Sequence, residues 1–219
     1  DKFKDRFFAG VPSIPKKKKD SMAIYLLFIQ HIIYSLKNKG KAAIVVPTGF
    51  ITAQTGIEKK IREKLVDDKM LKGVISMPSN IFATTGTNVS VIFLDRAYNG
   101  GKVLLVDATK LGKKIKDEGN QKTILRDFEV EKIINTFKNN EEIKDFSVLI
   151  DYDEIRQKNY SFSAGQYFKI ELEYINITEK EFTDKMNLHI SNLNKYFDES
   201  KILEENIQKG LKKLKYEES

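Results

Sequence analysis

The chain has 219 residues, of which 41% are hydrophobic and 32% charged, with a formal net charge of +7 and a pI of about 9.2. It contains no cysteine, which excludes disulfides, thiolate metal sites and cysteine nucleophiles, and two histidines far apart in sequence argue against a histidine-rich metal site. No apolar run approaches the length of a membrane span and the first residues form no secretory hydrophobic region, so we expect a cytoplasmic protein. Its length allows either one sizeable core or one domain plus an appendage.

The first segment is loop-like and basic. Gly10, Pro12 and Pro15 interrupt any period, and the run at 16–19 consists of lysines. This run is either a solvated loop or a phosphate contact, and the net charge suits a polyanionic partner, although coding bias also enriches lysine. Because the chain starts at Asp1 rather than at a methionine, we expect a fragment or a processed product.

The first predicted helix covers Met22–Lys37. Its apolar residues occupy nearly the whole circumference, which predicts a helix buried on most sides. Asn38, Lys39 and Gly40 end it and lead into a strand.

The segment 40–95 organises the chain as β-α-β-β. Apolar runs typical of strands lie at Lys41–Val46, Leu71–Met77 and Val89–Leu94. A strand, a helix and a strand in this order favour a parallel pair with a right-handed crossover. The loop Pro78–Asn88 is too short for another helical crossover, so the last two strands are predicted to pair antiparallel.

The helix between the first two strands is amphipathic. Ile57, Ile61 and Leu65 recur at spacings of four, and Thr55 with Glu58 is typical of a capping box. Its polar face is predicted to carry Lys59, Lys60, Arg62 and Lys64.

The next segments are shorter. A turn at 99–101 leads into a predicted strand over Lys102–Val106, a lysine-rich surface excursion over Ala108–Thr123 follows, and a short helix is predicted over Phe128–Lys138. The aromatic residues that come next are predicted to belong to the core rather than to a site: Tyr152, Tyr160, Phe162 and Tyr167.

The last segment predicts one or two long amphipathic helices. Thr178 and Glu181 form a second capping box, and a narrow apolar seam follows. Its members are Phe182, Met186, Ile190, Leu193, Phe197, Leu203, Ile207, Leu211 and Leu214. Such a seam must be covered, either by the chain's own domain or by helices of a partner.

Little in the sequence encodes chemistry directly. It has neither Gly-x-Gly-x-x-Gly nor a Gly-Lys-Ser/Thr phosphate loop, so a complete nucleotide site is not present. No catalytic triad stands out: His31 lies in the apolar first helix and is predicted to be structural, and His189 lies off the tail seam and is predicted to be solvated.

One loop does suggest a ligand. Phe82 lies among small and hydroxylated residues in the loop Pro78–Asn88, where its ring is placed to stack on a base, a contact that contributes about 1–3 kcal/mol. The alternative is that Phe82 only fills the end of the hairpin.

Several short segments, taken in order and spacing, carry a family resemblance. They are Phe28–His31 with Leu36, Gly40–Pro47 with Gly49, Ile61 and Arg62 with Leu65, Val74–Pro78 leading to Phe82, Thr85 and Gly86, then Lys102–Ala108 and Tyr160–Tyr167. Together they resemble the modification (M) subunits of type I restriction-modification systems, which are adenine-N6 DNA methyltransferases. The resemblance covers about Phe3 to Tyr167.

This resemblance implies an α/β fold. Residues 1–170 would be the later half of a Rossmann-like S-adenosylmethionine-dependent methyltransferase domain with an antiparallel terminal hairpin, and residues 171–219 a helical tail for subunit assembly. In the family the S-adenosylmethionine loop and the catalytic Asn/Asp-Pro-Pro-Phe/Tyr motif precede this region. We therefore expect most of the cofactor site and all catalytic residues to lie outside this chain, which alone would be inactive.

The resemblance also assigns roles to residues that are present. The family flips its target adenine out of the duplex, and Phe82 matches the aromatic position expected to stack on that base. The base-pocket wall would comprise Pro47, Thr48, Gly49, Phe50, Thr85 and Gly86.

The implied partners are DNA and a specificity (S) subunit that binds the tail helices, with a restriction (R) subunit as a further candidate and no membrane. The alternative function is a non-catalytic nucleic-acid-binding or assembly module that uses the basic surface and the tail.

Overall fold

The computed structural model describes residues 3–13, 22–82, 87–117, 120–169 and 177–213. The lysine run at 16–19, the predicted wall residues Thr85 and Gly86, and Leu214 of the tail seam lie outside these ranges. The chain divides into two units, Asp1–Lys169 and Ile170–Ser219. None of the described helices is long and apolar enough to cross a membrane.

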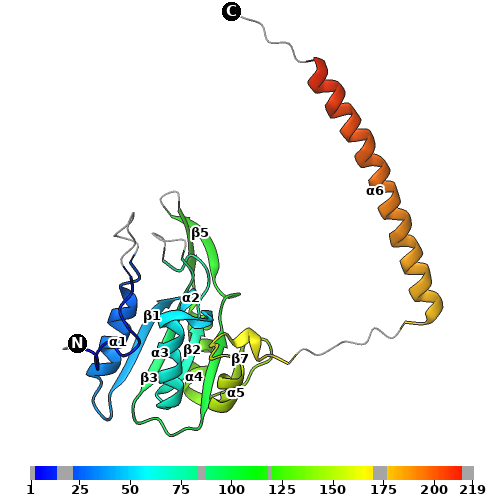
Figure 1. Ribbon diagram of the computed structural model, residues 1–219. Coiled ribbons are helices and arrows are strands. Elements are labelled where there is room, and N and C mark those ends of the chain that lie inside the picture. The colour runs from blue at the N-terminus through cyan, green and yellow to red at the C-terminus, as the bar shows by residue number, and fades with distance from the viewer. Residues whose placement is uncertain (1–2, 14–21, 83–86, 118–119, 170–176, 214–219) are drawn as a thin grey trace, which may run out of the picture. The chain divides into compact units, whose positions relative to one another are not determined.

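The first unit combines helices with strands (Figure 1). Its helices are α1 (Tyr25–Ser35), α2 (Thr48–Thr52), α3 (Gly56–Asp67), α4 (Asp127–Asn139), α5 (Tyr152–Gln157) and the 3-10 turn η2 (Ala164–Gln166). Its strands are β1 (Lys41–Pro47), β2 (Leu71–Ser76), β3 (Val89–Asp95), β4 (Lys102–Asp107), β5 (Lys113–Asp117), β6 (Asn120–Ile124) and β7 (Ser147–Asp151).

The main sheet has five strands in the order β1-β3-β2-β4-β7. The predicted antiparallel pairing of β2 with β3 is confirmed. The predicted neighbouring pair of β1 and β2 is wrong: both run in the same direction, but β3 lies between them and pairs antiparallel with each. Burial explains the insertion, because β3 is mostly buried along its length, as a central strand is, whereas β1 alternates between exposed and half-buried residues as an edge strand does.

Helices cover both faces of this sheet. One apolar cluster joins α1, α2, α3 and α5 to one face, and a smaller cluster joins Ile133 of α4 to Ile75, Leu104 and Val106 on the other. Gly73 in β2 is needed for this second contact, since a Cβ there would lie 2.6 Å from the Phe137 ring of α4. The predicted α/β class is confirmed.

The prediction that the first helix is buried on most sides is wrong. Only one face of α1 is buried, while Phe28 and Tyr34 on other faces are 61% and 54% exposed. The buried face includes Gln30, whose amide accepts the Ala9 N–H at 2.8 Å and donates to the Gly10 carbonyl at 3.0 Å. The described elements pack against this helix from one side only. The period of the apolar residues does not reveal how many faces of a helix its neighbours cover.

Arg62 also differs from its prediction. The sequence pattern puts it on the polar face of α3, yet its side chain is fully buried. Its guanidinium donates to the carbonyl of Tyr160 at 2.7 Å and to those of Phe50 and Ala53, and it lies 5.9 Å and 5.8 Å from the ring centroids of Phe50 and Phe162. Burial lowers the pKa of Arg62 to about 10, so it stays charged at neutral pH.

The two predicted capping boxes have different outcomes. Thr55 is the N-cap of α3 but makes no capping hydrogen bond, and Glu58 instead interacts with Tyr25, whose pKa is raised to about 12 by burial and by that carboxylate. At the tail, Thr178 N–H donates to Glu181 at 2.8 Å and Glu181 N–H donates to the Thr178 hydroxyl at 3.3 Å, so this box is confirmed.

The other late predictions hold in large part. Tyr152, Phe162 and Tyr167 are buried, as predicted, and Tyr160 is half-buried. The lysine-rich excursion contains the two-stranded β5–β6 hairpin. In the second unit the tail forms one helix, α6 (Glu179–Lys213).

We expect Arg62→Met to lower the free energy of unfolding by about 2–4 kcal/mol, because one buried and two partly buried carbonyls lose a charged donor. Chemical denaturation measures this loss. The matched control is Lys60→Met on the same helix, where the side chain is exposed and the change should stay within about 0.5 kcal/mol. Equal stability of the two variants would contradict the structural role of Arg62.

Candidate functional site

The strand register brings three connecting segments to one end of the sheet. Pro47 at the end of β1 pairs with Val89 at the start of β3, and Ser76 at the end of β2 pairs with both Ser90 of β3 and Asp107 at the end of β4. The segments after β1, β2 and β4 therefore start side by side. This is the end at which open α/β sheets place their ligands.

The segment after β1 is tied to its neighbour. Thr48 N–H donates to the Asn88 carbonyl at 2.8 Å, and the Thr48 hydroxyl lies 3.4 Å from the buried Ser90 hydroxyl. Pro47 and Thr48 are half-buried and Gly49 is exposed, whereas Phe50 is fully buried and packs edge-to-face on Tyr25 at 6.5 Å. Phe50 therefore supports this segment from the core and offers no exposed surface of its own.

The segment after β2 carries Phe82. Its ring is 48% exposed, so it is neither buried in the core nor fully solvated. Asn80, two residues earlier, adopts a left-handed backbone with φ of 54°. The Asn80 carbonyl accepts the N–H of Thr123 from β6 at 2.9 Å, which connects the Phe82 loop to the β5–β6 hairpin.

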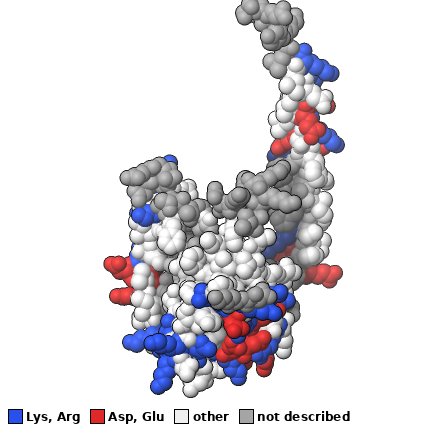
Figure 2. All heavy atoms as spheres, turned by 60° about the vertical axis from the view of Figure 1, so that its left-hand side comes forward, with Lys and Arg blue, Asp and Glu red and all other residues white. Residues whose placement is uncertain are grey.

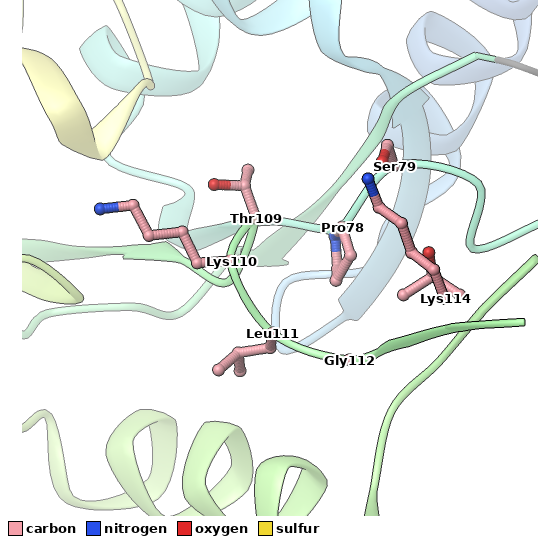
Figure 3. A pocket seen from close by; sticks show the side chains of 8 residues that line it. Pro78, Ser79, Thr109, Lys110, Leu111, Gly112 and Lys114 are labelled. Atoms are coloured by element: carbon pink, nitrogen blue, oxygen red, sulfur yellow. The ribbon is translucent and has the colours of Figure 1, made fainter.

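A cavity of about 310 Å³ opens where this loop, the segment after β4 and the hairpin meet (Figure 3). It is lined by Pro78, Ser79, Thr109, Lys110, Leu111, Gly112, Lys114 and Thr123. Asp107, next to it, accepts hydrogen bonds from the Thr109 N–H at 3.0 Å and from the Thr109 hydroxyl at 2.5 Å. Its carboxylate is therefore already engaged within the turn.

A buried carboxylate, that of Glu129, holds the far end of the segment that follows β4. Glu129 of α4 is 2% exposed, and it accepts the Gly112 N–H at 3.0 Å, the Arg126 N–H at 2.8 Å and the Arg126 guanidinium at 2.7 Å. The hydrogen bonds from Arg126, and then that from Gly112, lower the pKa of Glu129 to about 2. Gly112 has φ of 88°, a conformation that favours glycine.

The described residues hold no group of three or more histidine or acidic side chains suited to a metal ion. His31 is exposed and lies within 3.4 Å of the Ser35 hydroxyl on its own helix, and His189 is exposed on α6. No described strand is followed by a glycine-rich phosphate or nucleotide loop.

A family model described as N-6 DNA Methylase matches residues 1–174 of this chain. The chain belongs to the N-6 DNA methylase family. The resemblance inferred from the sequence segments is thereby confirmed, and membership of this family of methyltransferases implies the use of S-adenosylmethionine.

Curated relatives within the N-6 DNA methylase family are methylase subunits. The chain is 32% identical over 162 residues to the type I restriction enzyme MpnII methylase subunit of Mycoplasma pneumoniae, covering 73% of this chain and 28% of that protein. It is 28% identical over 199 residues to the type I restriction enzyme MjaIX methylase subunit of Methanocaldococcus jannaschii, covering 86% of this chain and 34% of that protein.

A solved structure agrees. The type I restriction-modification methyltransferase subunit from Streptococcus thermophilus aligns with a TM-score of 0.60 at 28% identity, over 74% of this chain and 36% of that one. The chain thus spans about a third of the length of these relatives.

Sequence reasoning found the Phe82 loop of this N-6 DNA methylase chain but missed the cavity beside it. Thr109, Lys110, Lys114 and Thr123 lie in a stretch interpreted only as a surface excursion. The available signal was the alternation of Lys114, Ile115 and Lys116, which is typical of a strand with one polar face.

The pKa of Glu129 predicts a pH dependence of stability. A carboxylate whose pKa is lowered by folding stabilises the protein above its ordinary value of 4.5, and that contribution is lost as pH falls toward about 2. We expect the wild type to lose more stability than Glu129→Gln between about pH 6 and about pH 3 in denaturant titrations. Glu131→Gln, at an exposed position of α4, should follow the wild type, and parallel curves for all three proteins would contradict the assignment.

Proposed function

We propose that this chain is the base-binding half and the subunit-binding arm of a site-specific DNA adenine-N6 methyltransferase of type I restriction-modification systems. The observation that carries the proposal is the half-exposed Phe82 at the ligand-binding end of the sheet, in a chain of the N-6 DNA methylase family. The methylated group would be the amino group of an adenine flipped out of the duplex.

Phe82 would stack on the flipped adenine. A base inside a duplex is out of reach of an enzyme, so it must leave the stack, and an exposed aromatic face replaces part of the stacking it loses. With 48% of its surface exposed, Phe82 has an aromatic face to offer. The bond between Asn80 and Thr123 restrains the loop close to that ring.

Pro47, Thr48 and Gly49 would form the wall of the base pocket on the β1 side. Thr48 is held to the other end of the Phe82 loop through Asn88, so these residues and that loop share one end of the sheet. Thr85 and Gly86 are proposed wall residues by the family resemblance alone. Phe50 contributes by supporting this segment from the core, and Arg62 holds the Phe50 carbonyl.

The S-adenosylmethionine loop and the catalytic motif would come from a part of the methyltransferase that this chain does not contain. The edge of the sheet at β1 offers a place for it, because among the described strands β1 pairs with β3 alone, which leaves its outer row of backbone groups for another strand. Val45 on this edge is 52% exposed. The chain alone would therefore not methylate DNA.

The tail would bind a specificity subunit. Within its unit α6 is the only described helix, and its seam is exposed: Phe182, Met186, Ile190, Leu193, Phe197, Leu203, Ile207 and Leu211. An amphipathic helix of 35 residues is about 52 Å long, enough to pack along partner helices over many turns. The DNA sequence would be read by that partner, and a restriction subunit is a further candidate for the assembly.

The base-stacking role predicts a graded effect in the complete methyltransferase. Losing a stacking contact of about 1–3 kcal/mol should lower kcat/KM for methyl transfer by about 5–150-fold in Phe82→Ala. Phe82→Leu keeps an apolar side chain but removes the ring, so it should resemble Phe82→Ala, whereas Phe82→Tyr should stay close to the wild type. Transfer of a radiolabelled methyl group and the fluorescence of 2-aminopurine at the target position measure the two effects.

Full activity and an unchanged fluorescence signal in Phe82→Leu would show that this residue only fills the hairpin end. A complete enzyme that transfers no methyl group to DNA at all would instead favour the non-catalytic binding module.

The tail role predicts loss of assembly when the seam is charged. Phe197→Asp should weaken binding to the specificity subunit by at least about tenfold, because a central apolar contact is replaced by a charge. Ser191→Asp adds the same charge on the opposite face of α6 and is the matched control. Binding by calorimetry or size-exclusion chromatography measures both, and equal binding by the two variants would refute the proposed interface.

A further inference from the structure

The β5–β6 hairpin has one face that combines lysines with hydrogen-bonding side chains. Lys114 pairs with Thr123 and Lys116 with Gln121, and directly paired residues lie on the same face of an antiparallel ladder. Because Lys114 and Lys116 are two residues apart, both pairs share that face. Lys114 and Lys116 are exposed, while Thr123 is only 3% exposed.

This face borders the cavity beside the Phe82 loop. In Figure 3, Lys114 extends toward Ser79, and Lys110 extends in the opposite direction beyond Thr109. The hydroxyl of Thr123 is buried and has no hydrogen-bond partner among the described residues, which is unusual for a buried polar atom and indicates a missing partner. Ammonium groups, hydroxyls and an unpaired buried oxygen are the groups expected around a phosphate or its bound water.

The local charge agrees with an anionic ligand. Between Lys110 and Ile124 the sequence contains five lysines and two acidic residues. Two acidic groups beside the cavity turn are already engaged, Asp107 by Thr109 and Glu129 by Gly112 and Arg126. By contrast, the side of the molecule seen in Figure 2 mixes charges of both signs over the lower end of the domain, so the net charge of +7 is not one continuous basic face there.

We propose that this face of the hairpin, with Lys110 and Ser79, contacts successive phosphate groups of the DNA backbone next to the target base. The inference rests on the proposed function, since it is the Phe82 loop that would hold that base. Thr123 donates to Asn80, two residues before Phe82, so the phosphate contact and the stacking ring belong to one connected unit. Two ammonium groups that extend in different directions suit neighbouring phosphates of a strand better than a single free anion.

Phosphate contacts of this kind have a defined signature. They add affinity without reading sequence, and each contributes close to one unit to the slope of log K against log salt concentration. The test uses the complete methyltransferase complex with the double variant Lys110→Ala and Lys114→Ala. Fluorescence anisotropy measures its affinity for a target duplex and a non-target duplex over a salt series.

The matched control is Lys37→Ala with Lys39→Ala. Both of these lysines are exposed and precede β1, at the opposite end of the sheet from the cavity. Methyl transfer by the wild-type complex is measured in parallel, so that the proposed function is tested separately.

We expect the cavity double variant to bind both duplexes about tenfold more weakly at low salt and to lower the salt slope by about 2, with the control close to the wild type. The inference would be overturned if the cavity double variant had the same salt slope as the control, or if it lost affinity for the target duplex alone. Methyl transfer by the wild type would in that case leave the proposed function intact. The salt slope could fall in the cavity double variant although the wild-type complex transfers no methyl group. That result would support the phosphate contact and refute the proposed function. Failure of the wild type to bind DNA would refute both.

Discussion

The buried guanidinium of Arg62 is the interaction on which the segments that follow the carboxyl end of β1 depend. It donates to carbonyls of Phe50, Ala53 and Tyr160, which belong to segments far apart in sequence. The N–H of Phe162 donates to the Ile51 carbonyl at 2.9 Å beside it, so α2, α3 and the segment near η2 are joined at one place. A buried charge is stable only when its donors are satisfied, and here backbone carbonyls and two aromatic rings satisfy it, while Glu58 and Glu63 add electrostatic attraction.

This arrangement explains how a short helix directly after β1 is held in place. α2 runs only over Thr48–Thr52 and makes no side-chain capping bond, so its position is set by Arg62 on one side and by the bond between Thr48 and Asn88 on the other. The second bond ties α2 to Asn88 at the end of the Phe82 loop, and the bond between Asn80 and Thr123 ties the start of that loop to the hairpin. In the proposed function, these two backbone hydrogen bonds hold the base-pocket wall to one end of the Phe82 loop and the phosphate contact to the other.

The exposed apolar surfaces fit a chain that works as part of an assembly. Phe28 and Tyr34 on α1 and Val45 on β1 are all more than half exposed, and within its own unit the seam of α6 is exposed along its length. Soluble proteins seldom leave such surfaces uncovered. In the proposed function the exposed residues of α1 and β1 would meet the part of the methyltransferase that holds the cofactor loop. The seam of α6 would meet a specificity subunit.

The sequence by itself determined the elements that depend on local pattern. The period of the apolar residues predicted β2, β3, β4, α3, α4 and the long α6, and the Thr178–Glu181 capping box formed as its spacing predicts. The turn-rich loop around Phe82 was also identified from its residues alone, because an aromatic among small polar residues between two strands is a local signal. The class of the fold followed from the order of these elements.

Only the tertiary structure decided which elements became neighbours and which side chains met. The sequence placed β1 beside β2, but the mostly buried β3 took the place between them, and strand order is set by burial on both faces rather than by order along the chain. Arg62 was predicted on a polar surface because lysines surround it in sequence, yet carbonyls from distant segments made its burial favourable. The cavity formed by Ser79, Thr109, Lys114 and Thr123 combines three separate segments, and no local pattern encodes such a meeting, since it depends on the register of strands that pair across the whole domain.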